Sequence, residues 1–241
     1  MAMKAFLLVV TAVVFHHAGT SSACAQKVLV GFKAGVELTD TFNVTSQTRT
    51  GRPHELFEAD IKRLIYGPTL EVTLPWSLGI EANALHKKLK YTSTTSEPID
   101  FFIQETTATS WEVPILLKRY SRRFGLFRLY GGGGLSLRHV SAHTHEDEFG
   151  PSFAPVFTCC QLVFSGTIPT RDLIHSWSSG LVFGGGVDIQ RSSFHVSPEL
   201  QYTRWSNESF RSLGLSGAPG SASIHSTRNT LEFLIRFTYG L

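Results

Sequence analysis

His195, Ser197 and Glu199 are the residues whose types and spacing come nearest to a hydrolytic site. Positions two apart share one face of an extended strand, so a histidine base could activate the Ser197 hydroxyl as a nucleophile. Gln201 falls on the same face, which indicates a polar set that points inward. We therefore predict no catalytic residue here, and a hydrolase stays an alternative.

A second cluster, His139, His143 and His145 followed by the acidic residues 146–148, could bind a metal ion. Histidines two apart on an extended loop can converge on one cation. The same residues also suit a solvated polar loop, which is the interpretation we prefer. We expect no metal and no cofactor.

Charged residues of both signs alternate with apolar residues along most of the chain. In a narrow protein interior, charges withdrawn from water persist only where they are paired and hydrogen-bonded. The alternation predicts an interior charge network that comprises Lys33, Glu37, Glu71, Glu81, Glu112, Lys118, Arg128, Arg138, Asp188, Glu199, Glu232 and Arg236.

Eight segments with period-two hydrophobicity must position these residues. Each has about the ten residues that a tilted membrane strand needs. The last is the clearest, with an apolar face formed by Phe233, Ile235, Phe237, Tyr239 and Leu241. The predicted strands are 28–38, 66–74, 78–87, 111–120, 127–138, 181–189, 194–202 and 231–241.

The connections between these strands alternate strictly between short and long. Residues 75–77, 121–125 and 190–193 form the short connections, and the long ones are 39–65, 89–110, 139–180 and 203–228. Outer-membrane barrels alternate short turns with long loops, whereas Greek-key sandwiches have no reason to do so. We predict an all-β, closed, antiparallel, up-and-down transmembrane β-barrel of eight strands. An extra hairpin within 139–180 would make ten.

Aromatic residues near the predicted strand ends indicate girdles at the two membrane boundaries, because Trp and Tyr favour that interface. They are Trp76, Trp111, Trp205, Tyr91, Tyr202 and Tyr239.

The N-terminal segment has the pattern of a secretory signal. Lys4 precedes an apolar run, and small residues surround a cleavage position before Gln26. We predict a signal peptide over 1–25 and a barrel domain over 26–241, with lipid attachment at Cys24 as the alternative. The adjacent Cys159 and Cys160 would make a strained disulfide and are expected in a loop. A net charge of only +3 gives no indication of nucleic-acid binding.

The segments 31–36, 111–118 and 197–205 resemble the outer-membrane-protein β-barrel domain family, the porin-like, OmpA-type eight-stranded barrels of Gram-negative bacteria. The resemblance implies a monomer in the outer-membrane bilayer, inserted by the barrel assembly machinery through its C-terminal strand. Leu241 stands where that family more often has Phe. Lipid A deacylases carry a His-x-Ser pair like His195 and Ser197, but Pro198 stands where they usually have Asn.

The family resemblance implies a non-enzymatic protein with a structural or surface-interaction role. The alternatives are a narrow channel for small solutes or ions, a lipid-modifying barrel enzyme, and a soluble lipocalin-like binder. The last would bury the apolar faces and expose the charged ones.

Overall fold

The computed structural model describes residues 27–45, 54–60, 63–96, 101–150, 161–213 and 223–241. The predicted signal peptide over 1–25 and the cysteine pair at 159–160 lie outside these residues. Nearly all described residues are in strands, with one short 3-10 turn, η1 (Pro75–Ser77). Among the described residues, no helix is long and apolar enough to cross a membrane.

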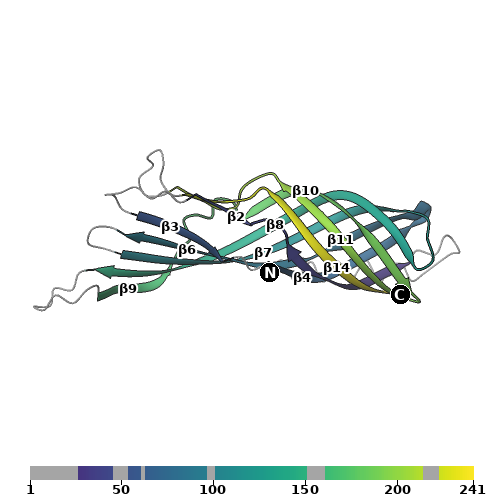
Figure 1. Ribbon diagram of the computed structural model, residues 1–241, viewed down its shortest axis with the longest axis horizontal. Coiled ribbons are helices and arrows are strands. Elements are labelled where there is room, and N and C mark those ends of the chain that lie inside the picture. The colour runs from purple at the N-terminus through teal and green to yellow at the C-terminus, as the bar shows by residue number, and fades with distance from the viewer. Residues whose placement is uncertain (1–26, 46–53, 61–62, 97–100, 151–160, 214–222) are drawn as a thin grey trace, which may run out of the picture.

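Eight antiparallel strands close into a barrel (Figure 1). Closure occurs at β1, which pairs with β14 on one side and β4 on the other. Strand β4 pairs with both β5 and β6, so these two segments act as one barrel strand. The barrel strands are β1 (Val28–Glu37), β4 (Leu64–Leu74), β5 (Leu78–Asn83) continued by β6 (Leu85–Ser96), β7 (Phe101–Tyr120), β8 (Phe127–Gly150), β10 (Trp177–Arg191), β11 (Phe194–Trp205) and β14 (Asn229–Gly240).

The eight-stranded prediction is thereby confirmed, and the ten-stranded alternative is wrong. The additional strand β9 (Gln161–Ile168) pairs with β8 only over residues 144–150, beyond the closed part of the barrel. It therefore extends one hairpin and does not enter the wall.

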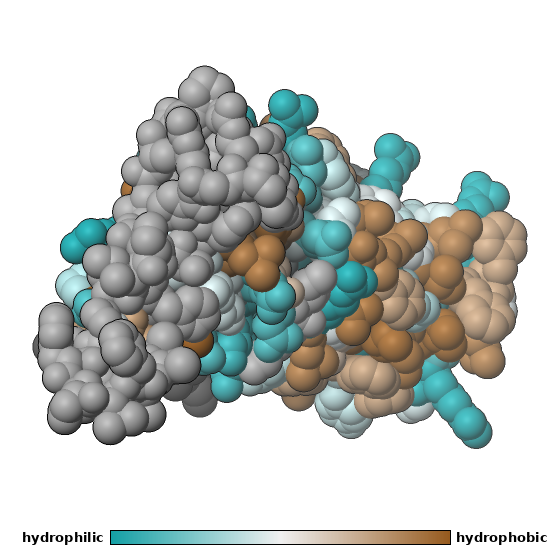
Figure 2. All heavy atoms as spheres, turned by 60° about the vertical axis from the view of Figure 1, so that its left-hand side comes forward, coloured by the Kyte–Doolittle hydropathy of each residue, from teal (hydrophilic) through white to brown (hydrophobic). Residues whose placement is uncertain are grey.

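The two faces of the wall differ sharply in polarity. On the outer face Leu135 is 63% exposed and Phe183 is 53% exposed, whereas the inward-facing Lys33 and Glu81 are 0% exposed. The outward apolar side chains form an apolar belt around the barrel, visible as the brown region of Figure 2. A soluble barrel would place these apolar side chains in its core, so the lipocalin-like alternative is wrong.

Three strands run far beyond the barrel and form a protruding sheet. Strands β6, β7 and β8 continue outward together, flanked by β3 (His54–Asp60) on one side and β9 on the other (Figure 1). The prediction of loops over 89–110 and from 139 onward is wrong for this part. Threonines recur in 92–95 and 106–109, and β-branched residues favour a paired strand.

We call this end of the barrel the loop end and the opposite end, with the three short turns, the turn end. A small sheet of β2 (Phe42–Thr45), β12 (Arg211–Leu213) and β13 (Ser223–Ser226) lies at the loop end. Its Phe42 and Ile224 pack with Tyr91 and Phe210 in a buried hydrophobic cluster, which we call the cap. Burial and the neighbouring Asp172 carboxylate raise the pKa of Tyr91, whose hydroxyl donates to that carboxylate at 2.6 Å.

Candidate functional site: the barrel interior

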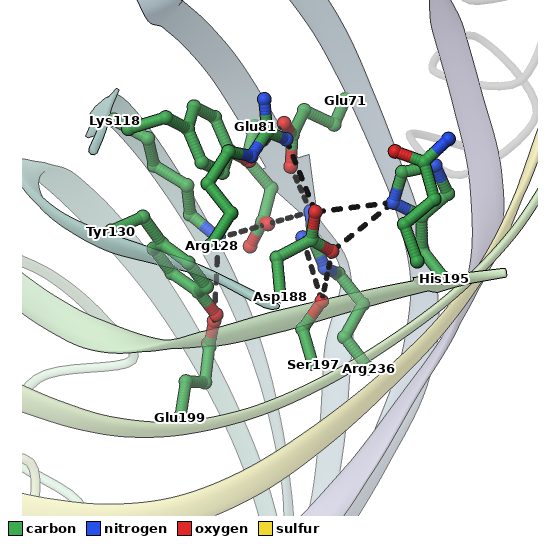
Figure 3. A network of polar contacts seen from close by, with 12 residues as sticks. Glu71, Glu81, Lys118, Arg128, Tyr130, Asp188, His195, Ser197, Glu199 and Arg236 are labelled. Carbon is green, nitrogen blue, oxygen red and sulfur yellow. Dashed lines mark hydrogen bonds and ion pairs between the residues drawn. The ribbon is translucent and has the colours of Figure 1, made fainter. Parts of the chain in front are cut away.

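Six charged side chains from six strands meet in the middle of the barrel, and Figure 3 labels all of them except Lys33. We call them the central charge cluster: Lys33, Glu71, Glu81, Lys118, Glu199 and Arg236. Lys33 Nζ lies 2.5 Å from Glu81 Oε1 and 2.5 Å from Glu199 Oε1, and Arg236 Nη1 lies 2.8 Å from Glu81 Oε2. Arg236 also pairs with Glu71, and Lys118 pairs with both Glu81 and Glu199. Three bases face three acids, so the cluster is neutral.

Two tyrosines fill the space beside these charges. The Tyr130 hydroxyl donates to Glu199 Oε2 at 2.6 Å, and the Tyr120 hydroxyl donates to Glu71. Their ring centroids are 5.4 Å apart, and Lys118 Nζ lies 4.3 Å from the centre of the Tyr130 ring. The rings and ion pairs together pack the lumen, as expected for a barrel of only eight strands.

His195 and Ser197 share the inner face, but each contacts Asp188 (Figure 3). Ser197 Oγ donates to Asp188 Oδ1 at 2.9 Å and accepts from Arg236 Nη2 at 3.0 Å. His195 Nδ1 lies 3.1 Å from Asp188 Oδ1. A nucleophilic serine needs a base on its proton and access to substrate. Here the hydroxyl proton points to a carboxylate, and Ser197 is fully buried.

A second group of charges lies nearer the loop end, and we call it the loop-end charge cluster: Glu37, Lys87, Glu112, Arg138 and Glu232. Lys87 Nζ lies 2.9 Å from Glu112 Oε1 and 3.5 Å from Glu37 Oε2. Arg138 Nε donates to Ser178 Oγ at 3.0 Å, and its guanidinium lies 4.2 Å from the centre of the Trp205 ring. Three acids face two bases, so this cluster carries one uncompensated acid.

Glu232 is the acid with the weakest compensation. It lies directly opposite Glu37 in the register of β1 and β14, and like charges in that position repel. Its carboxylate accepts one hydrogen bond, from Gln201 Nε2 at 3.3 Å, and its Oε1 has no partner among the described residues.

We expect Glu232→Gln to raise the free energy of unfolding by about 1–2 kcal/mol, because it removes a buried like charge and keeps the side-chain shape. Urea titration of the barrel refolded into lipid vesicles measures this change. The control, Glu112→Gln, removes the 2.9 Å partner of Lys87 and should lower the free energy of unfolding. If both variants lowered the free energy of unfolding equally, Glu232 would be a stabilising anion.

Eleven of the twelve residues predicted for the interior network are buried, and the twelfth, Arg128, has a side chain that is 16% exposed. Arg128 Nη2 lies 3.1 Å from Asp188 Oδ2, which places this pair between the central charge cluster and the turn end. The predicted network omitted Lys87, Tyr120 and Tyr130. The period-two pattern already put Tyr130 on the inner face of 127–138, and continuing the pattern along 78–87 and 111–120 would have added Lys87 and Tyr120.

The histidines considered for a metal site lie on strand β8, not in a loop. The His139 ring packs 4.5 Å from the Trp177 ring, and His145 Nε2 lies 3.5 Å from Asp147 Oδ1. Within the part of the chain that the structure describes, no three potential metal ligands come together.

The aromatic girdle prediction is wrong for two of its six residues. Trp205 and Tyr91 point inward and are 0% and 1% exposed, since their strands continue beyond the ends that the sequence suggested. Trp111, Tyr202 and Tyr239 are exposed on the outer face, and Trp76 is exposed at a turn.

A sheet that spans a membrane must pair all its backbone N–H and C=O groups, because hydrocarbon offers them no partner. A closed sheet with an apolar outer face meets this requirement, since it leaves no strand edge unpaired. The pairing of β1 with β14 closes the ring, and the apolar belt surrounds it. The chain is an eight-stranded β-barrel of the outer-membrane type. The barrel architecture that the family resemblance implied is thus confirmed.

No family model matches this barrel, and no curated protein sequence matches it either. Among solved structures, it is similar to Ail, the attachment invasion locus protein of Yersinia pestis, with 9% identity and a TM-score of 0.32 over 89% of this chain and 97% of that chain. A second structure of Ail, in complex with the heparin analogue sucrose octasulfate, gives 9% identity and a TM-score of 0.33 over 89% and 99%. The barrel architecture of this chain follows from its own strand pairing.

Proposed function

We propose that the barrel is a non-enzymatic protein of a bacterial outer membrane that acts through its protruding sheet. The supporting observation is that the chain continues β6, β7 and β8 well beyond the belt while its lumen is packed. In outer-membrane barrels the short turns face the periplasm and the long connections face outward. The protruding sheet is then on the cell surface.

The packed lumen argues against the channel alternative. Ions would have to pass the neutral central charge cluster and then the cap, in which Phe210 and Ile224 are 0% exposed. Opening a path would break ion pairs buried away from water.

We therefore expect the refolded full chain to give no unitary conductance steps in a planar bilayer, because side chains fill the interior. Discrete steps that persist in repeated preparations, and that a charge-removing variant such as Lys118→Met alters, would contradict the proposal and favour the channel.

The protruding sheet has two edges that suit contact with a partner. Within the described ranges β3 pairs only with β6, and β9 only with β8, so each presents one edge without a strand partner. Leu56 on β3 and Phe164 on β9 are 45% and 43% exposed. An exposed apolar edge strand is a template for another chain, and lysine on such a strand blocks that pairing.

The test compares attachment of bacteria that display the full chain to a cultured animal cell layer. We expect Leu56→Lys with Phe164→Lys to reduce attachment several-fold. The matched control, His143→Lys, adds the same charge to an exposed position of β8 away from the edge strands and should retain attachment. Equal attachment by all three, and by cells without the chain, would sink the surface-interaction role.

The proposal includes the secretion of the chain and its insertion into the outer membrane. Residues 1–25 would direct secretion, and the alternate apolar residues from Phe233 to Leu241 would be recognised by the barrel assembly machinery. In β14 the side chains of Phe233, Phe237 and Tyr239 face outward, where another protein can contact them during insertion. The folded chain would be a monomer.

A further inference from the structure

Exposed arginines and aromatic side chains gather at the turn end. We call this surface the turn-end rim: Trp76, Arg119, Arg122, Arg123, Phe124 and Arg191. Trp76 and Phe124 are 89% and 70% exposed. A few hydrophilic side chains stand out sideways from the brown region near this end of the molecule (Figure 2).

The fold brings three separate turns into this one surface. The backbone N–H of Gln190 donates to Leu126 O at 3.0 Å, and the Arg123 guanidinium donates to the Gln190 side chain, so the β7–β8 and β10–β11 turns are joined. Arg119 lies opposite Leu78, the first residue after the η1 turn that carries Trp76.

The charge on the rim is of one sign. The segments 74–78, 119–127 and 189–194 contain no Asp or Glu. The nearest acid along the chain, Asp188, is buried and paired with Arg128. In the described part of the chain, the guanidinium groups of Arg119 and Arg191 have no hydrogen-bond or ion-pair partner.

The loop end differs in part, because three of its exposed cations are paired with an acid of the chain. Arg63 lies 3.2 Å from Asp40, Lys90 lies 2.9 Å from Glu105, and Arg211 lies 2.9 Å from Glu208. Among the described residues, no acid forms an ion pair with the arginines of the turn-end rim, so the rim presents several neighbouring cations that an external anion can bind.

We propose that the turn-end rim binds the phosphate headgroups of anionic phospholipids in the leaflet that it faces. The exposed side chains of Leu117, Leu126 and Phe127 adjoin the rim, so a bilayer that surrounds the apolar belt would bring lipid phosphates close to the rim. Arginine binds phosphate through paired N–H donors, and exposed Trp and Phe side chains insert among the adjoining acyl chains. Zwitterionic lipids carry their own ammonium group, so an all-cationic rim selects anionic ones.

The conformation of the first turn agrees with this placement. Trp76 and Ser77 have φ values of 62° and 60°, a region that costs free energy for residues other than glycine. The turn keeps this strain and projects the indole away from the barrel wall. The inference requires only that the barrel spans a bilayer and does not rest on the proposed surface-interaction role.

The test uses the refolded full chain and native mass spectrometry, with phosphatidylglycerol and phosphatidylcholine titrated separately. We expect tighter retention of phosphatidylglycerol, and a loss of about fivefold or more in its affinity in the variant Arg122→Gln with Arg191→Gln. A fivefold change corresponds to about 1 kcal/mol, the usual contribution of one arginine near an anionic membrane surface.

The matched control, Arg171→Gln with Arg204→Gln, removes the same charge from exposed loop-end positions and should retain phosphatidylglycerol. Heat-modifiable migration on a denaturing gel checks that each variant folds. Equal binding of the two lipids, or an equal loss in both double variants, would overturn the proposal. Complete displacement of phosphatidylglycerol by inorganic phosphate would also overturn it, since the site would then take the free ion.

Discussion

Replacing Arg236 by Met is expected to lower the free energy of unfolding of the barrel by about 3–5 kcal/mol. The guanidinium is 0% exposed and contacts Glu71, Glu81 and Ser197. These two carboxylates lie directly opposite each other in the register of β4 and β5. Without Arg236 they repel across adjacent strands in a site that water does not reach.

The measurement is urea unfolding in lipid vesicles, followed by the migration of unboiled samples on a gel. Adding Glu71→Gln to Arg236→Met should recover part of the lost stability, because it removes the carboxylate that Arg236 neutralised. If Glu71→Gln instead lowers the free energy of unfolding further, uncompensated charge is not the cause of the loss in Arg236→Met. Arg236→Lys should fall between wild type and Arg236→Met, since it retains the charge but has one donor group where the guanidinium has several.

A second large effect is expected at Gly134 in β8. A Cβ atom at this position would lie 1.8 Å from the backbone oxygen of Ile115 and 3.0 Å from Leu116 Cα on the neighbouring strand β7. Both are backbone atoms, so no side-chain rotation relieves the clash. We expect Gly134→Ala to cost about 3 kcal/mol or to prevent closure of the barrel, as overpacking that moves backbone does.

The control comes from the same run of glycines. At Gly131 the nearest atom to an added Cβ is Gly184 O, at 3.9 Å. Gly131→Ala should therefore change the free energy of unfolding by less than about 1 kcal/mol. Heat-modifiable migration and urea titration of both variants provide the comparison. Similar behaviour of the two would mean that β7 and β8 can separate at no cost.

Particular strands show how far the amino-acid pattern reaches. The alternation from Phe233 to Leu241 predicted β14, and the inward positions of Glu232 and Arg236 followed from it. The same reasoning located the interior positions of Lys33 and Glu199. It succeeds because side chains alternate between the two faces of a strand. Once one residue is assigned to the inner or outer face, the faces of all the others follow.

The pattern failed where the environment of a strand changes along its length. Beyond the belt, β6, β7 and β8 no longer face lipid, so their outward residues become polar and the apolar alternation disappears. Strand continuity there depends on pairing between 89–96 and 101–108, which one segment alone does not reveal. Trp205 and Tyr91 were misplaced for the same reason. The predicted strands ended too early, so both residues were expected at a membrane boundary.

By itself, the sequence determined the number of barrel strands, their inner and outer faces, and the alternation of short turns with long connections. These properties follow from local periodicity and from turn length. Only the tertiary structure decided which charges meet, because contacts such as Lys33 with Glu199 and Arg236 with Glu71 join strands far apart in sequence. Which charges meet depends on the stagger of the strands around the closed barrel. The same stagger brings three turns together in the turn-end rim.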